Sequence, residues 1–185
     1  MSPITRRKAM YLREIAEIIF SFPEKDEVTK AEWICPAFLQ EENVLTETKT
    51  EIGLKPSKSS EVRGGDIVIK RIQPQFVNYL SKDANAHAGQ NLVIVRSTGH
   101  VSPKYLAYLM ERDIHKLYND TTGTVLTSVN RKSFDNFDVG DLPPLNIQVA
   151  IGELWWLEKE KSKLCKELLI KEKQQLLNKL RKLMK

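Results

Sequence analysis

Three groups of polar side chains in the sequence have the chemistry to contact another molecule specifically. They are Lys70, Arg71 and Gln75, then His87 and Gln90, and then Thr124, Arg131 and Lys132. Arginine and glutamine side chains can form paired hydrogen bonds to the edges of guanine and adenine, and lysine and threonine suit phosphate oxygens. The eight residues are therefore candidate DNA contacts. The alternative interpretation is that they belong to ordinary polar loops.

The sequence lacks the patterns that mark common catalytic sites. It has no phosphate-binding glycine loop of the ATPase type, no glycine-rich dinucleotide turn and no Gly-x-Ser-x-Gly elbow. His87, His100 and His115 are isolated, and Cys35 lies far from Cys165, so no spacing suits a zinc site or a disulfide framework. We therefore predict that the chain is not an enzyme and holds no catalytic residue, metal or cofactor.

The net charge is distributed unevenly along the chain. Of the formal charge of +5, residues 140–185 contribute +4, because they hold ten lysines or arginines against six acidic residues. The preceding residues are nearly neutral at +1. An interaction with nucleic acid must therefore depend on local basic clusters and not on the overall charge.

Residues 142–145 (LPPL) divide the chain into two parts. Before them the pattern changes about every ten residues and includes strand-like runs at 67–69, 75–80 and 91–96, a proline-initiated helix from Pro103 and a turn at 22–27. Residues 12–20 fit either a helix or a strand. We predict a globular α+β domain over 1–142, with a mixed or antiparallel sheet, and a helix over 143–185.

The C-terminal part predicts one long helix with an apolar stripe. From residue 147 to 185 it has no proline and one glycine, and good helix formers dominate. The stripe consists of Leu154, Leu157, Leu164, Leu168, Leu176, Leu180 and Leu183. Because a single helix cannot bury its own stripe, we expect these leucines to pair with a partner helix in a coiled-coil-like contact.

No feature of the sequence indicates a membrane or an exported protein. No apolar run reaches the roughly 18–20 residues that a membrane span needs. The charges of Arg13, Glu14 and Glu17 interrupt any apolar stretch near the N-terminus, unlike in a secretory signal. We therefore expect a cytoplasmic protein with reduced cysteines.

Several segments together resemble the target recognition domains of type I restriction–modification specificity subunits. These segments are residues 65–70 (GDIVIK), 87–92 (HAGQNL), 103–109 (PKYLAYL) and 142–148 (LPPLNIQ), in the order and spacing of that family. The chain departs from the family at Ile147, where glutamate is frequent, and at residues 21–24, where a Gly-Gly-Thr-Pro turn is usual. The resemblance covers about residues 60–160.

The resemblance implies a non-catalytic role in sequence-specific DNA recognition. A full-length specificity subunit of that family has two recognition domains and two spacer helices in tandem. This chain has one of each and resembles a half-length form. A homodimer through the C-terminal helix would then read a bipartite, interrupted palindrome. The expected partners are double-stranded DNA, methyltransferase subunits that carry S-adenosylmethionine, and restriction subunits. The alternative is an assembly protein that does not read DNA.

Overall fold

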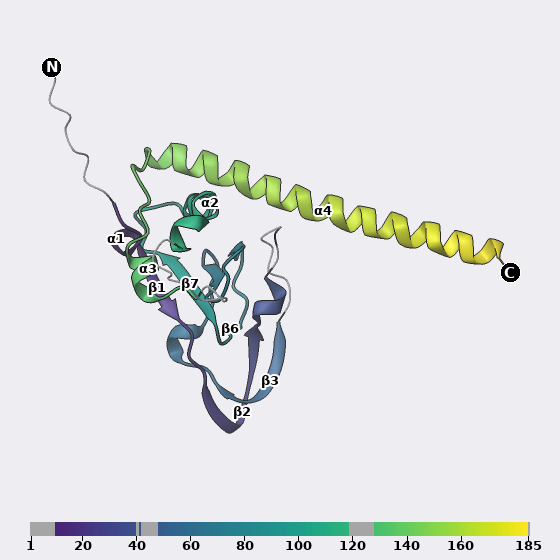
Figure 1. The fold of residues 1–185 in the computed structure, drawn as a ribbon, viewed down its shortest axis with the longest axis horizontal. Coiled ribbons are helices and arrows are strands. Elements are labelled where there is room, and N and C mark those ends of the chain that lie inside the picture. Colours follow the sequence, from purple (N-terminus) through teal and green to yellow (C-terminus); the bar gives the residue numbers. More distant parts are fainter. Residues whose placement is uncertain (1–9, 40, 42–47, 119–127, 185) are drawn as a thin grey trace, which may run out of the picture.

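The computed structural model describes residues 10–39, 41, 48–118 and 128–184. A domain built around two sheets carries a long helix that extends far beyond it (Figure 1). The helices are α1 (Leu12–Ile15), α2 (Pro103–Arg112), α3 (Arg131–Asp135) and α4 (Leu145–Leu183). The strands are β1 (Ala16–Phe20), β2 (Glu24–Ile34), β3 (Lys49–Lys55), β4 (Ile67–Lys70), β5 (Val77–Tyr79), β6 (His87–Ala88) and β7 (Leu92–Ser97). Three short 3-10 turns are η1 (Pro36–Phe38), η2 (Lys58–Ser60) and η3 (Ile114–Tyr118).

The central layer is a four-stranded antiparallel sheet in the order β1-β7-β4-β5. Both of its faces are covered, which explains the nearly continuous apolar runs in β4 and β7. Ile67 and Ile69 of β4 join one core cluster beneath α2, whereas Val68 and Ile94 join a second cluster on the opposite face. The alternation of side chains along each strand therefore divides one short sequence between two cores.

A smaller three-stranded sheet in the order β3-β2-β6 covers the second face. β2 pairs antiparallel with β3 and parallel with β6. Ile34 and Ala88 supply the contact with the central sheet, and both are fully buried. The register of β2 against β3 shifts between Lys25 and Lys30, so the strand bulges there, at the end of the domain that lies furthest from α4 (Figure 1).

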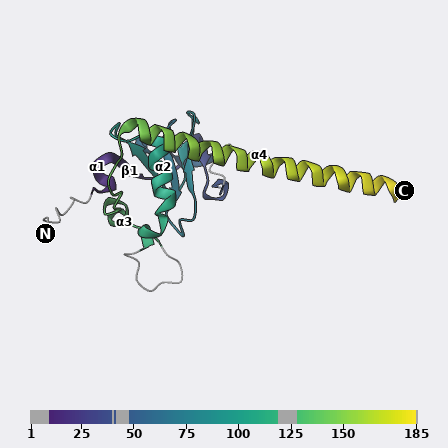
Figure 2. The same ribbon diagram turned by 90° about the horizontal axis from the view of Figure 1, so that it is seen from above.

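α4 packs across α2 at its N-terminal end and then leaves the domain (Figures 1 and 2). Gln148, Gly152 and Trp156 are the buried residues of this 39-residue helix, and they recur every four residues on one face. Gly152 is needed for the close approach, since a Cβ atom there would lie 2.7 Å from the backbone nitrogen of Tyr105. No helix in the described part of the chain combines the length and apolarity that crossing a bilayer requires.

The α+β class and the long C-terminal helix predicted from the sequence are confirmed. The turn predicted at residues 22–27 is wrong, because β2 already begins at Glu24. The exposed polar residues of β2 gave no strand pattern in the sequence, because pairing with β3 fixes the backbone there without burying the side chains. The ambiguous residues 12–20 contain both structures, with α1 ending at Ile15 and β1 beginning at Ala16.

Candidate nucleic-acid interface

One end of the central sheet gathers residues from distant parts of the sequence. The backbone nitrogen of Arg71, just after β4, donates to the carbonyl of Asn91 at 2.7 Å, and the carbonyl of Arg71 accepts from Val129 at 2.9 Å. Ser21, just after β1, donates its backbone N–H to Leu92 at 3.3 Å. The segments that follow β1 and β4 and the segments that precede β7 and α3 therefore meet at this place.

Six of the eight sequence-predicted contact residues lie on the segments at this end, which we call the basic end. They are Lys70, Arg71, Gln75, Gln90, Arg131 and Lys132. Gln75 belongs here because it lies in the loop that joins β4 to β5, and Gln90 because it precedes β7. Gln75, Gln90, Arg131 and Lys132 are exposed, and Lys70 and Arg71 are half-buried.

A hollow of about 350 Å³ opens between these segments, and it is lined by Phe20, Phe22, Arg71, Asn130 and Arg131. It combines two guanidinium groups with two aromatic rings. The Phe20 ring lies edge-on to Phe134 in the core, at 5.9 Å between centroids, and this contact anchors the inner wall. The Phe22 ring stacks beside Phe20 at 6.4 Å and 12°, yet 62% of Phe22 remains exposed.

The two arginines at the hollow differ in their exposure and in their partners. Arg131 is the first residue of α3 and makes a loose ion pair with Asp135, with 3.6 Å between Nε and Oδ1. The Nε atom of Arg71 is buried and has no hydrogen-bond partner among the described residues. Asn130 caps α3 by accepting the backbone N–H of Ser133 at 3.0 Å, so this residue fixes where Arg131 begins the helix.

Two sequence-predicted residues are not gathered at the basic end. His87 belongs to β6, where its ring lies 5.8 Å from the buried Trp33 and its Nδ1 is 3.4 Å from the hydroxyl of Ser60. Burial lowers the pKa of His87, so the neutral ring is favoured. Thr124 lies outside the described residues. A DNA contact by either residue stays a prediction.

Sequence reasoning missed Phe20, Phe22 and Asn130 as members of the site. Asn130 stands directly before Arg131, and its capping role could be anticipated from the short helix that follows. Phe22 carried a weaker signal: an aromatic residue beside Pro23 and a run of charged residues. Only the pairing of β1 with β7 brings the two phenylalanines next to Arg71.

The motif residue Asp66 holds the turn before β4. Its carboxylate is almost fully buried and forms a double hydrogen bond with Arg96, at 2.8 Å from Nε and 2.7 Å from Nη2. The same carboxylate accepts the backbone N–H of Arg63 at 2.7 Å. The hydrogen bonds from Arg96 to the Asp66 carboxylate raise the pKa of Arg96. Asp66 therefore fixes the start of the strand whose other end carries Lys70 and Arg71.

The motif residue Gln148 joins α4 to α2. Its Oε1 atom accepts the backbone N–H of Ser102 at 3.0 Å, and its Nε2 atom donates to the carbonyl of Pro143 at 2.8 Å. Ser102 stands at the N-cap of α2, directly before the proline that begins the helix, although its side chain makes no capping hydrogen bond. The buried Gln148 side chain thus locks the proline turn that directs α4.

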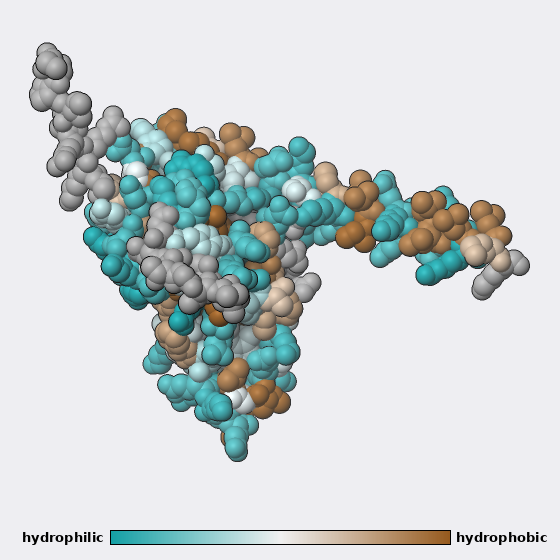
Figure 3. All heavy atoms as spheres, viewed as in Figure 1, coloured by the Kyte–Doolittle hydropathy of each residue, from teal (hydrophilic) through white to brown (hydrophobic). Residues whose placement is uncertain are grey.

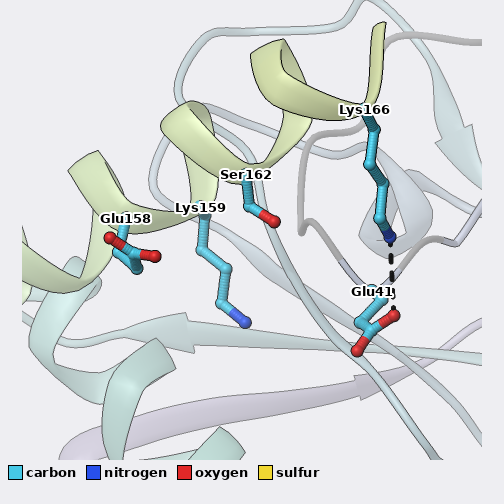
Figure 4. A pocket seen from close by; sticks show the side chains of 5 residues that line it. All are labelled: Glu41, Glu158, Lys159, Ser162 and Lys166. Atoms are coloured by element: carbon cyan, nitrogen blue, oxygen red, sulfur yellow. Dashed lines mark ion pairs between the residues drawn. The ribbon is translucent and has the colours of Figure 1, made fainter. Parts of the chain in front are cut away.

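Charged side chains hold the next turns of α4 against the domain. Lys104 of α2 pairs with Glu153 at 2.6 Å, and Glu111 of α2 accepts from both Trp155 and Lys159. Farther along, Lys166 reaches Glu41 at 3.5 Å across a hollow of about 250 Å³ (Figure 4). The Lys166–Glu41 pair is exposed and contributes little, the other two pairs are partly buried, and the buried Trp156 is the main apolar anchor.

The rest of α4 is exposed on every side from Leu164 to Met184. The predicted stripe residues Leu154, Leu157, Leu164, Leu168, Leu176, Leu180 and Leu183 are all between 47% and 83% exposed. Leu169, Ile170 and Leu177 add further exposed apolar area, and Figure 3 shows the apolar residues gathered along the outer part of the helix. None of the residues that the structure describes covers this apolar surface.

Comparisons with known proteins agree with this architecture. A crystal structure of the HsdS subunit from Thermoanaerobacter tengcongensis superposes with a TM-score of 0.64 at 15% identity, over 91% of this chain and 46% of that one. A structure described as showing complex assembly and conformational transition of the type I R-M system gives 0.61 at 16% identity, over 91% and 42%.

The S subunit of the type I restriction–modification system from M. genitalium superposes with a TM-score of 0.53 at 12% identity, over 94% of this chain and 45% of that one. This chain therefore spans under half the length of the solved structures it matches, and at such identities the likeness concerns the fold. A search of curated proteins gave no match.

The match to a sequence family carries more weight than the likeness in fold, because it is a match of the sequence itself over most of the chain. The family described as the type I restriction modification DNA specificity domain matches residues 8–155. That range includes the whole basic end, the Asp66 turn and the base of α4 as far as Trp155. The chain belongs to the type I restriction modification DNA specificity domain family.

Proposed function

We propose that the protein reads a DNA sequence for a type I restriction–modification system in the cytoplasm, and that the basic end faces the DNA. The observation that carries this proposal is the meeting of Arg71 and Arg131 in one hollow. An arginine fork can bind the O6 and N7 atoms of guanine in the major groove.

The charge distribution supports a local and not a general attraction to DNA. The chain carries little excess positive charge before residue 140, yet four of the six residues at the basic end are lysine or arginine. Without these four residues, residues 1–139 carry a net negative charge, so within this part of the chain DNA would be attracted to the basic end. Residues 1–142 would form the recognition domain, and residues 143–185 would form the spacer helix.

We further propose that α4 pairs with a second copy of the chain through its exposed leucines. The two recognition domains would then be held apart and related by two-fold symmetry, so the target would be a bipartite, interrupted palindrome. The protein would position methyltransferase subunits, which would supply S-adenosylmethionine and the methyl-transfer chemistry, and also restriction subunits. Its own residues would bind and orient the DNA.

The proposal is tested with the full chain and a random duplex library. Cyclic selection should enrich an interrupted palindrome, and fluorescence anisotropy on the enriched duplex should show a steep loss of affinity between 50 and 200 mM salt, as phosphate contacts require. Selection without an enriched sequence, together with a flat salt dependence, would contradict it. That result would favour the assembly protein that does not read DNA.

The Arg71→Ala variant tests the basic end directly. If Arg71 reads a base, the change should weaken binding to the enriched duplex by about 1–3 kcal/mol and relax the preference at one position. Arg71→Lys keeps the charge but loses the planar fork, so it should restore general affinity without restoring the base preference. The control is Arg63→Ala, an exposed arginine outside the basic end. Unchanged binding by Arg71→Ala would remove this residue from the interface.

A further inference from the structure

Phe22 is an apolar side chain that folding leaves largely exposed beside two arginines. Its 62% exposure is not explained by the core, because the core contact at this place is made by Phe20 and Phe134. Three hollows on the described surface, near Glu41, near Gly64 and near Asp83, are lined by residues that include no aromatic side chain. The hollow at Phe22 alone among these four has aromatic walls.

A ligand in this hollow must suit both the arginine and the phenylalanine side chains that line it. Two guanidinium groups favour a ligand with acceptor atoms or negative charge, and two phenylalanine rings favour an apolar group next to those acceptors. In the major groove of DNA, guanine offers the O6 and N7 acceptors, whereas thymine offers a methyl group at C5. A base step that contains guanine and thymine presents both features side by side.

We propose that Phe22, supported by Phe20, reads the C5 methyl group of a thymine that lies next to a guanine contacted by Arg71 or Arg131. The inference rests on the proposed function, since it needs the basic end to face the major groove. Phe22 is then a specificity-determining residue. Phe20 acts as its support, because its ring is fixed edge-on to Phe134 and stacked beside Phe22.

The position of Phe22 in the chain fits such a role. It lies two residues beyond the end of β1 and two before the start of β2, so the two sheets fix the chain on both sides. The buried Ser21 anchors it further: its backbone N–H donates to Leu92, and its hydroxyl donates to the carbonyl of Ala88. The exposed ring is therefore held in a set place, as discrimination of a single methyl group demands.

The test replaces each thymine of the enriched duplex by deoxyuridine, one at a time. This change removes only the C5 methyl group and leaves base pairing intact. At one position per half-site, next to a guanine, the replacement should weaken binding by the full chain about three- to five-fold, the effect of burying one methyl group. The Phe22→Ala variant should bind the thymine duplex more weakly than the unchanged protein does, and should bind the thymine and deoxyuridine duplexes equally. The Phe22→Leu variant should keep part of the preference for thymine.

The control is Val28→Ala, which removes an even more exposed apolar side chain from the β2 bulge and should leave the discrimination intact. Equal binding of all the deoxyuridine duplexes by the unmodified protein would overturn the inference and leave the proposed function standing. The thymine assignment would also be overturned if replacing a cytosine by 5-methylcytosine changed the binding affinity while no deoxyuridine replacement did. If selection enriches no sequence at all, the proposed function itself fails.

Discussion

The two halves of α4 belong to one continuous helix but depend on different contacts. The proximal half, residues 145–163, buries Gln148, Gly152 and Trp156 against the domain. The distal half, residues 164–184, is exposed on all sides although it is rich in leucine. The proximal half therefore has its direction set by this chain, whereas the distal half has an apolar surface that none of the described residues covers.

Under the proposed function, this difference separates two tasks of α4. Contacts to α2 orient the helix relative to the recognition domain, so changes there should affect folding. Contacts of the distal leucines would set the distance to a second domain, so changes there should affect association and leave folding intact. Variants of each half, measured for both properties, test this separation.

Trp156→Ala should have the largest effect on folding. The indole is 5% exposed and meets Tyr79 edge-on at 5.1 Å, so truncation removes a large buried side chain and leaves a cavity. We expect a loss of about 3–5 kcal/mol in the free energy of unfolding, measured by urea denaturation. Leu157→Ala at the next, exposed position should cost far less, and equal losses for the two variants would contradict the assigned anchor.

Gly152→Ala should have the next largest effect. The new methyl group would meet the backbone nitrogen of Tyr105 at 2.7 Å and the Cβ of Lys104 at 2.9 Å, so α4 must move away from α2. The expected cost is about 1–3 kcal/mol from overpacking, reduced by the better helix propensity of alanine. The measurement is thermal unfolding, with Asn146→Ala on the exposed surface of α4 as the control. A stabilised Gly152→Ala variant would show that the close approach is unimportant.

Acid should destabilise the C-terminal end of α2, the helix on which α4 packs, by a smaller amount. Asp113, at the C-terminal end of α2, accepts hydrogen bonds from Arg112 and Lys116, and these contacts lower its pKa to about 2. A lowered folded-state pKa stabilises the protein above pH 4, and this contribution is lost as the pH falls from about 4 to about 2. We expect about 1 kcal/mol, because Arg112 is partly solvated.

The measurement is urea denaturation between pH 6 and pH 2.5 for the unchanged protein and for Asp113→Asn. The variant should be less stable at pH 6 and should lose less stability on acidification. Glu160→Gln, at an exposed position of α4, is the control for the general loss of negative charge. Parallel pH profiles for the protein and for Asp113→Asn would rule out the contribution of Asp113.

The distal leucines should have the smallest effect on folding. Replacing Leu168, Leu176 and Leu180 by serine removes no buried contact in the single chain, so each change should alter the free energy of unfolding by under about 0.5 kcal/mol. Sedimentation should nevertheless show a loss of the dimer. Lys171→Ser with Lys173→Ser is the matched control on the same half. A dimer that survives the three leucine changes would place the self-association elsewhere.

The local elements of this protein could be predicted where the sequence pattern itself fixes the backbone. The β-branched run at 67–69 lies in β4, Pro103 begins α2 at its first residue, and Pro143 and Pro144 directly precede α4. The candidate site was predictable in part. Arg71 and Arg131 were identified by type, since few other side chains can form a planar pair of donors. Nothing in their spacing of sixty residues indicates that both line one hollow.

The sequence by itself determined the α+β class, the long helix and its apolar stripe, because periodicity and helix propensity act over a few neighbouring residues. Only the tertiary structure decided that β2 begins at Glu24, that Phe22 stands beside Arg71 and that α4 has two unequal halves. These features depend on strand pairing and on the contact with α2. Such contacts join residues that are far apart in the chain, and their free energy depends on geometry that no local pattern encodes.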